Sequence, residues 1–370
     1  MIDVLCRGDE SGNNMVFRRK LSSGREIFGL ATENHYGGEW DLGPTLNYLV
    51  TGESPFLIDT GNIGQGLPLL EMIKRVGFRP SDLAFIILSH GHEDHDGGLS
   101  EIAGSGSTKI VAHETYGRLT RIYPDKAPSG EKNGFSASCW HCPMPRSFSQ
   151  EYCSQYHEAR DNMTVNCISG SEEVLSDGVS VFHIPGHSPD SVAIVVDNEV
   201  MFVGDTILPD ITPRPTLEKF FGLTKEILPG QYNEADQLYG LRAYIRSLKK
   251  LKKLGKNLPD ILVLPAHRLF YNNKWNDITL DQRVDELIDH HVQRCAAIID
   301  ILEQKPRTAE ETARTYFEAK YLKGYGIIMA IDEIISHCEL LELSGDVIPA
   351  EDGKLAATGG AGFESFVKDL

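Results

Sequence analysis

Apolar residues in the first two thirds of the chain come in short runs that glycine, proline, asparagine and aspartate interrupt. Seven of these runs have the length and the β-branched content of strands, at residues 45–50, 55–59, 83–89, 109–112, 179–184, 192–196 and 200–203. Apolar positions at helical spacing predict helices between some of them, at residues 67–76 and 234–254. Strands mixed with helices on this scale indicate a layered α/β architecture.

Helical spacing dominates the last quarter of the chain. After a strand at residues 260–264, the pattern predicts a helix from about 281 to 302, which Pro306 ends. Thr308 and Glu311 have the spacing of a capping box, and a third helix is predicted at 327–343 before a Ser-Gly-Asp turn. We therefore expect a winged-helix-like module at residues 281–370, after a larger domain at residues 1–280.

Charge and hydropathy narrow the possible partners. The net charge is −17, and residues 281–370 hold nine Lys and Arg against eighteen Asp and Glu. The third helix carries Asp332, Glu333, Glu339 and Glu342 without a basic residue. Because phosphate neutralisation provides most non-specific affinity for nucleic acid, we expect no strong nucleic-acid binding. The module would instead serve in homodimerisation or in covering a cleft.

No apolar run approaches the ~20 residues of a membrane span, and residues 1–19 lack the apolar region of a signal peptide. We therefore expect a cytoplasmic protein without a membrane partner.

Residues 88–98 contain the strongest chemical signal. They read Leu-Ser-His-Gly-His-Glu-Asp-His-Asp-Gly-Gly and follow an apolar strand. Four metal-binding side chains thus emerge together at a strand end: His90, His92, Asp94 and His95. Imidazole nitrogens and carboxylate oxygens suit zinc, iron and manganese. A solvated polar turn is the alternative, but it seldom contains three histidines and an aspartate in this order.

Three later loops also begin where an apolar run ends, and they contain His187, Asp205 and His267. A single histidine or aspartate in such a place is more often a capping or surface residue. Together with the first cluster, the set and its order indicate metal ligands.

With these residues in place, the chain resembles hydrolases of the metallo-β-lactamase superfamily, in the glyoxalase II-like branch, over roughly residues 45–267. The resemblance implies an αββα sandwich with two metals at one edge. It also implies that His90, His92 and His187 hold one metal, that Asp94, His95 and His267 hold the other, and that Asp205 bridges them.

Two further segments extend this resemblance. Leu57-Ile-Asp59-Thr-Gly is similar to the family's first motif, which implies that Asp59 orients ligands and does not bind metal itself. Residues 204–213 and the C-terminal module resemble a poorly characterised subgroup of cytoplasmic hydrolases with a winged-helix-like region. A related branch with that architecture includes endoribonucleases.

The implied chemistry is hydrolysis. Two divalent ions about 3.5 to 4 Å apart can share one water, lower its pKa and present a bridging hydroxide to the substrate. Asp94 or a metal-bound water could then manage the leaving-group proton. Zinc is the favoured ion, with iron or manganese as alternatives.

We expect a small ester, thioester or lactone as the substrate. The alternatives are a phosphodiesterase or ribonuclease, and a sulfur dioxygenase with a single iron. The sequence identifies neither the substrate nor the oligomeric state.

His187 follows His95 by 92 positions, which is a long separation for this family, and the excess falls at residues 121–167. This insertion holds Cys139, Cys142, Cys153 and His157 at a spacing that resembles a structural zinc site. Free or buried thiols in a lid are the favoured interpretation, and a redox pair of Cys139 and Cys142 is a third.

Several other residues have no pattern of partners. His113, His183, His290, His291 and His337 are interpreted as structural or exposed. Residues 35–42 contain aromatics that could line a cleft, although ordinary packing is favoured.

Overall fold

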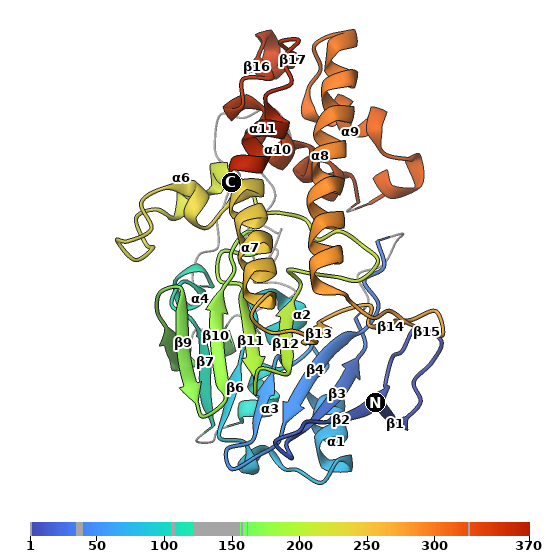
Figure 1. Ribbon diagram of the computed structural model, residues 1–370, viewed down its shortest axis with the longest axis vertical. Coiled ribbons are helices and arrows are strands. Elements are labelled where there is room, and N and C mark those ends of the chain that lie inside the picture. Colours follow the sequence, from blue (N-terminus) through green and yellow to red (C-terminus); the bar gives the residue numbers. More distant parts are fainter. Residues whose placement is uncertain are drawn as a thin grey trace.

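Two mixed β-sheets form the centre of the larger part of the molecule (Figure 1). The computed structural model describes residues 2–34, 40–104, 108–120, 156, 158–160, 162–324 and 326–370. The first sheet takes its strands in chain order: β1 (Ile2–Cys6), β2 (Val16–Lys20), β3 (Glu26–Thr32), β4 (Thr45–Val50), β5 (Phe56–Ile58), β6 (Phe85–Ile87), β7 (Lys109–His113) and β8 (Val165–Ile168). The second has the order β13 (Leu262–Pro265), β12 (Val200–Gly204), β11 (Val192–Val196), β10 (Val179–His183) and β9 (Glu172–Ser176).

Strand direction changes within each sheet. Neighbouring strands from β1 to β5 are antiparallel, and those from β5 to β8 are parallel. In the second sheet only the β12–β13 pair is parallel. The parallel strands end at a shared edge, and the loops that follow them can therefore meet there.

The two sheets pack face to face through one buried core. Phe17, Tyr48 and Phe56 of the first sheet share this core with Val181 and Phe202 of the second. The outer face of the first sheet is covered by α1 (Gly66–Arg75) and α3 (Leu99–Ala103), and that of the second by α7 (Gly240–Gly255), against which α8 (Leu280–Gln304) packs in turn. The expected α/β architecture is thus confirmed, with a helix, sheet, sheet, helix order of layers.

The C-terminal helices gather at one end of the molecule, beyond the ends of the sheets (Figure 1). They are α8, α9 (Ala309–Tyr316), α10 (Gly326–Leu343) and α11 (Phe363–Asp369), with a hairpin of β16 (Val347–Pro349) and β17 (Leu355–Ala357). The capping box is confirmed, since Glu311 N–H donates to Thr308 Oγ1 at 3.1 Å and Thr308 N–H donates to Glu311 Oε2 at 2.9 Å. One continuous apolar core joins these helices to α7 and the second sheet.

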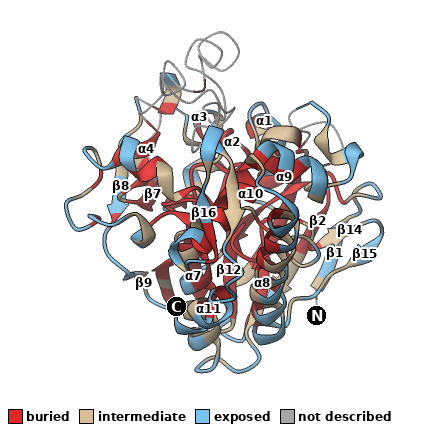
Figure 2. Cartoon of the chain, turned by 90° about the horizontal axis from the view of Figure 1, so that it is seen from above, coloured by how far each residue is buried: buried red, intermediate tan, exposed pale blue. Residues whose placement is uncertain are grey.

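Burial along α10 differs from its sequence pattern. Asp332 and Glu333 are only 2% and 6% exposed, although acidic residues at helical spacing would ordinarily form a solvated face. Figure 2 shows the surroundings of α10 from above, with exposed positions on the outer helices α8 and α9. The helix is enclosed by neighbours that provide partners for its carboxylates.

Some helix and strand boundaries differ from the predicted ones, and the reasons are local. The helix predicted from residue 234 begins as the short turn η3 (Ala235–Gln237), and α7 starts only at Gly240, whose φ is 83°. The N-terminal strands β1 to β3 were not predicted, because Val16-Phe-Arg-Arg-Lys and its neighbours lack strict alternation.

The remaining short elements are η1 (Pro80–Asp82), α2 (Glu93–Asp96), α4 (Tyr116–Leu119), η2 (Glu218–Phe220), α6 (Phe221–Thr224), β14 (Phe270–Tyr271), β15 (Lys274–Trp275), η4 (Ala319–Leu322) and η5 (Glu351–Gly353). Within the described residues, no helix combines the length and the apolar character that crossing a membrane requires.

Candidate metal centre

Seven histidine and aspartate side chains meet at one edge of the two sheets. His90 and His92 follow β6, and Asp94 and His95 lie on the short helix α2. His187, Asp205 and His267 come from the loops that follow β10, β12 and β13. The seven residues named from the sequence therefore lie together in two groups. Within each group, the potential ligand atoms lie within 4.8 Å of one another.

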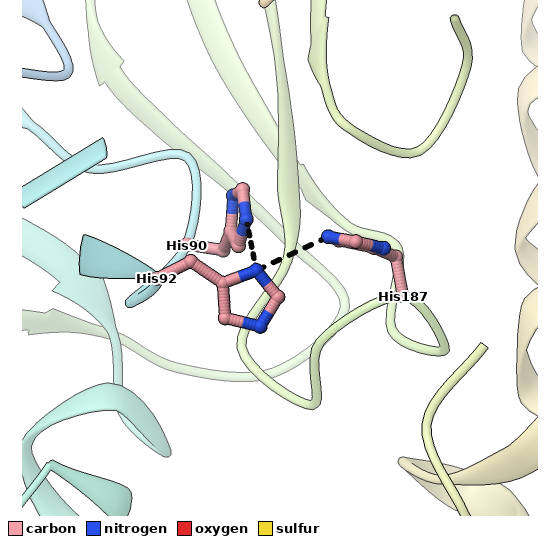
Figure 3. Close-up of side chains that lie close together, drawn as sticks. All are labelled: His90, His92 and His187. Atoms are coloured by element: carbon pink, nitrogen blue, oxygen red, sulfur yellow. Dashed lines mark hydrogen bonds between the residues drawn. The ribbon is translucent and has the colours of Figure 1, made fainter. Parts of the chain in front are cut away.

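The first group consists of His90, His92 and His187. Nε2 of His90 lies 3.0 Å from Nδ1 of His92, and Nε2 of His187 lies 3.2 Å from the same nitrogen. Figure 3 shows the three rings converging on one point, with the His92 ring between the other two. Three imidazole nitrogens facing one another at this spacing are suited to a shared cation.

The second group consists of Asp94, His95, Asp205 and His267, and all four are buried. His267 Nε2 lies 3.2 Å from Asp94 Oδ2 and 3.3 Å from Asp205 Oδ1. His95 Nε2 lies 3.6 Å from Asp94 Oδ1 and 3.5 Å from Asp205 Oδ1. Two carboxylates and two imidazoles thus share one enclosed space.

Asp205 belongs to both groups by its geometry. Its Oδ1 faces His95 and His267, whereas its Oδ2 lies 3.6 Å from Nε2 of His187 in the first group. One carboxylate therefore presents an oxygen to each donor set.

The far nitrogens of three rings are held by neighbours to which the sequence analysis gave no such role. Ser89 Oγ lies 3.1 Å from His90 Nδ1. Nδ1 of His187 and of His267 each lie 3.0 Å from a backbone carbonyl, that of Arg214 and of Pro44. Such bonds fix the ring orientation and leave Nε2 free to bind a metal. Only Ser89 had a sequence signal, since it directly precedes His90.

Asp59 holds the fourth ring. Its Oδ2 lies 3.0 Å from His95 Nδ1, and its two oxygens accept hydrogen bonds from the Ser89 backbone N–H and Oγ, both at 2.7 Å. It lies outside both donor groups. This placement suits an orienting residue.

Burial sets the charge of the first group. It lowers the pKa of His90 well below the usual range, that of His92 to about 3, and that of His187 less strongly. These rings are therefore neutral at pH 7 and keep a lone pair for a metal.

Charge is balanced differently in the second group. Burial opposes a charge on His267, but Asp205 and Asp94 raise its pKa to about 9. Burial would raise the pKa of Asp205, yet His267 and His95 hold it well below its usual value. The two carboxylates therefore draw positive charge into this space, and a bound metal would replace protons there.

Unpartnered atoms show that metal ions fit the site. His95 Nε2, His267 Nε2 and Asp205 Oδ1 are buried and make no hydrogen bond to any part of the chain that the structure describes. A buried polar atom without a partner costs about 1–3 kcal/mol, and binding a cation would remove that cost.

A third set, His291, Glu333 and His337, also brings three donor atoms together. Here, however, the Glu333 carboxylate is paired with the Arg294 guanidinium, whose positive charge opposes a second cation. His337 Nδ1–H donates to the Glu333 carbonyl at 2.6 Å, and its Nε2 lies 2.9 Å from His291 Nδ1. We interpret this set as a structural hydrogen-bonded group.

Other sequence hypotheses have mixed outcomes. His113 and His183 are buried with stacked rings, as expected of structural residues, and His290 is partly buried. Trp40 packs against Phe317 and donates from Nε1 to the Tyr321 carbonyl at 2.9 Å. Residues 35–39 lie outside the described residues, as do Cys139, Cys142, Cys153 and His157.

The end of the insertion contacts the ligand loop. Arg160 Nε lies 3.1 Å from Asp96 Oδ2, and Arg160 Nη2 donates to the Gly91 carbonyl at 3.2 Å. The hydroxyls of Tyr116 and Tyr156 also donate to Asp96. Asp96 therefore anchors the insertion and lies outside both donor groups.

Comparison with known proteins identifies the family. The model of the metallo-beta-lactamase superfamily matches residues 40–267, more than half of the chain. The chain belongs to this superfamily. The probable metallo-hydrolase YqjP of Bacillus subtilis is 24% identical over 323 residues, which cover 81% of the chain and 88% of that protein.

An N-acyl homoserine lactonase of Bacillus cereus is 28% identical over 180 residues. This match covers 42% of the chain and 59% of the lactonase, so the chain spans less than two thirds of that relative's length. The family, these relatives and the buried donor groups identify the chain as a metal-dependent hydrolase of the superfamily.

Solved structures agree on the fold. A beta-lactamase domain protein from Burkholderia ambifaria has a TM-score of 0.66 at 18% identity, covering 96% of this chain and 97% of that one. A metallo-beta-lactamase family protein from Thermus thermophilus has a TM-score of 0.62 at 22% identity, covering 90% and 98%. Both likenesses extend through the C-terminal helices, so the two sheets and those helices form one shared architecture.

Proposed function

We propose that this superfamily member is a dinuclear hydrolase that opens a small lactone, ester or thioester, with zinc as the favoured metal. The observation that carries the proposal is the placement of the Asp205 carboxylate, which presents one oxygen to each of two donor groups. The similarity to N-acyl homoserine lactonases supports lactones as the first substrate class to test.

His90, His92 and His187 would hold one ion, Asp94, His95 and His267 the other, and Asp205 both. When bound, such a pair of ions supplies a hydroxide nucleophile at neutral pH and stabilises the oxyanion of acyl transfer. No serine or cysteine nucleophile is required.

Asp94 has the position to handle the proton of the leaving group. Asn34 Nδ2 donates to its Oδ2 at 3.0 Å, and Oδ1 faces the centre near His95. The amide fixes the carboxylate, which can then accept a proton from the nucleophilic water and deliver it to the departing alkoxide or thiolate.

We further propose a place within the superfamily: the glyoxalase II-like branch, with residues 1–280 as the catalytic domain and 281–370 as a winged-helix-like module. Three helices followed by the β16–β17 hairpin support this proposal. Its partners would be a small-molecule substrate and, for the module, a second copy of the chain.

The test combines metal analysis with turnover. Protein purified without chelator should contain close to two divalent ions per chain and hydrolyse N-acyl homoserine lactones, p-nitrophenyl esters or acyl thioesters. Bis-p-nitrophenyl phosphate is assayed in parallel. It tests the alternative of phosphodiesterase activity, which the resemblance to winged-helix-like endoribonucleases suggests. Turnover of that substrate alone would replace our assignment, and one tightly held iron per chain would favour the sulfur dioxygenase.

Asp205→Asn tests the shared carboxylate. Losing one negative charge between two cations should lower turnover at least ~100-fold and reduce metal content below two, with circular dichroism unchanged. Asp285→Asn is the control, because Asp285 is an exposed aspartate of α8 that pairs with Lys252 outside both donor groups. Normal activity in Asp205→Asn would exclude the bridging role.

A further inference from the structure

The segment after Asp205 lies against the loop that carries His187. The carbonyl of Arg214 accepts a hydrogen bond from His187 Nδ1–H at 3.0 Å. The carbonyl of Gly186 accepts two more from Thr216, from its backbone N–H at 2.7 Å and from its hydroxyl at 2.8 Å. Residues 214–216 therefore hold both the candidate ligand and the residue before it.

Helix α10 holds the same segment from the other side. The Asp332 carboxylate binds Arg214 Nη1 at 2.5 Å. Glu339, two turns further along the helix, accepts the backbone N–H groups of Glu218 and Lys219 at 2.8 and 3.0 Å. The segment is thus tied to one helix at two places, at Arg214 and at residues 218–219.

These contacts matter because residues 205–217 form neither helix nor strand. The position of such a segment depends on the bonds it makes to neighbouring elements. Helix α10 spans eighteen residues and is largely buried, so it provides a rigid anchor. Asp332 is 2% exposed, and a carboxylate this deeply buried requires its charged partner.

We propose that Asp332 is a positioning residue for the metal centre: together with Glu339 it fixes the 205–220 segment, whose Arg214 carbonyl orients the His187 ring. The proposal rests on the proposed function in one respect, that His187 holds a metal. It gives the C-terminal helices a part in the hydrolytic site, and it explains why Asp332 and Glu339 of α10 are directed toward the 205–220 segment.

The test measures zinc release and needs no substrate. Zinc-loaded full-length protein is mixed with excess chromogenic chelator, and the release of zinc is followed over time. Two sites should give two kinetic phases of release. The phase that is missing in His187→Ala is then assigned to the site of His90, His92 and His187. In Asp332→Asn that phase should accelerate about 10-fold or more, since partners of ligating histidines typically contribute 10–100-fold to metal affinity. The phase of the other site should change by less than about 3-fold.

Three variants complete the experiment. Glu339→Gln should accelerate the same phase by an independent route, and it keeps the test decisive if Asp332→Asn does not fold. Asp332→Glu should restore slow release, because it keeps the charge. Glu342→Gln is the matched control, as an exposed carboxylate on the same helix, and it should match the wild type.

The outcomes separate this proposal from the proposed function. Equal acceleration of both phases would reveal general loosening and overturn the positioning role, as would release at the wild-type rate. Selective acceleration in a protein that hydrolyses none of the substrates would leave the positioning role standing while the hydrolase assignment failed.

Discussion

At the residue scale, Asp59 combines an unusual backbone with a central set of contacts. Its φ is 60°, in the left-handed region that asparagine also tolerates. Asp59→Asn therefore leaves the backbone unstrained and removes only the charge that faces His95 and Ser89. We expect metal affinity and turnover to fall by roughly 10–100-fold, because the tautomer of His95 is no longer enforced.

Chelator competition and turnover would measure this effect. Asp260→Asn is the control, since Asp260 is an exposed aspartate with a φ of 67° far along the chain. Equal metal affinity in the two variants would show that Asp59 does not orient the candidate metal ligands.

A second prediction at this scale concerns His113 and acid. Burial lowers its pKa from the usual 6.5 to about 4. As pH falls below 6.5 the unfolded chain binds a proton that the folded chain does not, so the free energy of unfolding decreases until about pH 4. The contribution of His113 to the free energy of unfolding is complete above about pH 6.5 and is lost as the pH falls toward 4.

His113→Gln isolates this contribution. The variant loses packing against His183, but its unfolded chain also lacks the titrating ring. Its deficit relative to the wild type should therefore be smaller at pH 5 than at pH 8, by roughly 2 kcal/mol. Urea unfolding at both values measures it, and an unchanged deficit would contradict the lowered pKa.

The sequence revealed side-chain chemistry better than backbone chemistry. The seven donors could be named because histidine and aspartate after apolar runs are conspicuous, and they lie together in the structure. The carbonyls of Pro44 and Arg214 could not be named, since every residue has one and only the folded chain selects which of them meets a ring. The roles of the donors toward metal stay predictions.

At the element scale, the loop before His187 depends on close contact with α7. Gly186 has a φ of 131°, and a Cβ there would lie 2.3 Å from the backbone of Tyr244. Gly186→Ala should therefore push the loop away from the helix, lower the free energy of unfolding by about 1–3 kcal/mol and reduce metal content.

Gly222→Ala provides the comparison. A Cβ at Gly222 meets no described atom within 4 Å, so this variant should be neutral or slightly stabilising. Urea unfolding and metal analysis apply to both. A Gly186→Ala protein with full stability and two metals would show that the loop can move without cost.

Element prediction succeeded where local pattern and tertiary contact agree. The capping box at Thr308 and the strand β4 (Thr45–Val50) were predicted because their signals are local. The burial of Asp332 was not, because the Arg214 side chain that pairs with it lies 118 positions earlier. Periodicity describes one face of a helix and not its distant partners.

At the scale of the whole molecule, the charge of the C-terminal module determines whether it can bind nucleic acid. The module has twice as many acidic as basic residues, and we predict no binding of single- or double-stranded oligonucleotides tighter than micromolar at moderate salt. Fluorescence anisotropy on the full-length chain would measure this. Micromolar or tighter affinity that weakens steeply with salt would favour the ribonuclease alternative. Truncation before residue 281 is unsuitable, because α8 shares its core with α7.

The wide spacing of the ligands along the chain has a consequence for biosynthesis. His90 to His95 leave the ribosome early, but Asp205 and His267 follow much later. At 5–20 residues per second, roughly ten to thirty seconds pass before the last donor is made. A nascent chain therefore exposes only part of the donor set during that interval, and α10 is translated later still. If the seven donors hold metal as proposed, tight loading would need the finished polypeptide, and the metal supply after translation would then set how much of the enzyme is active.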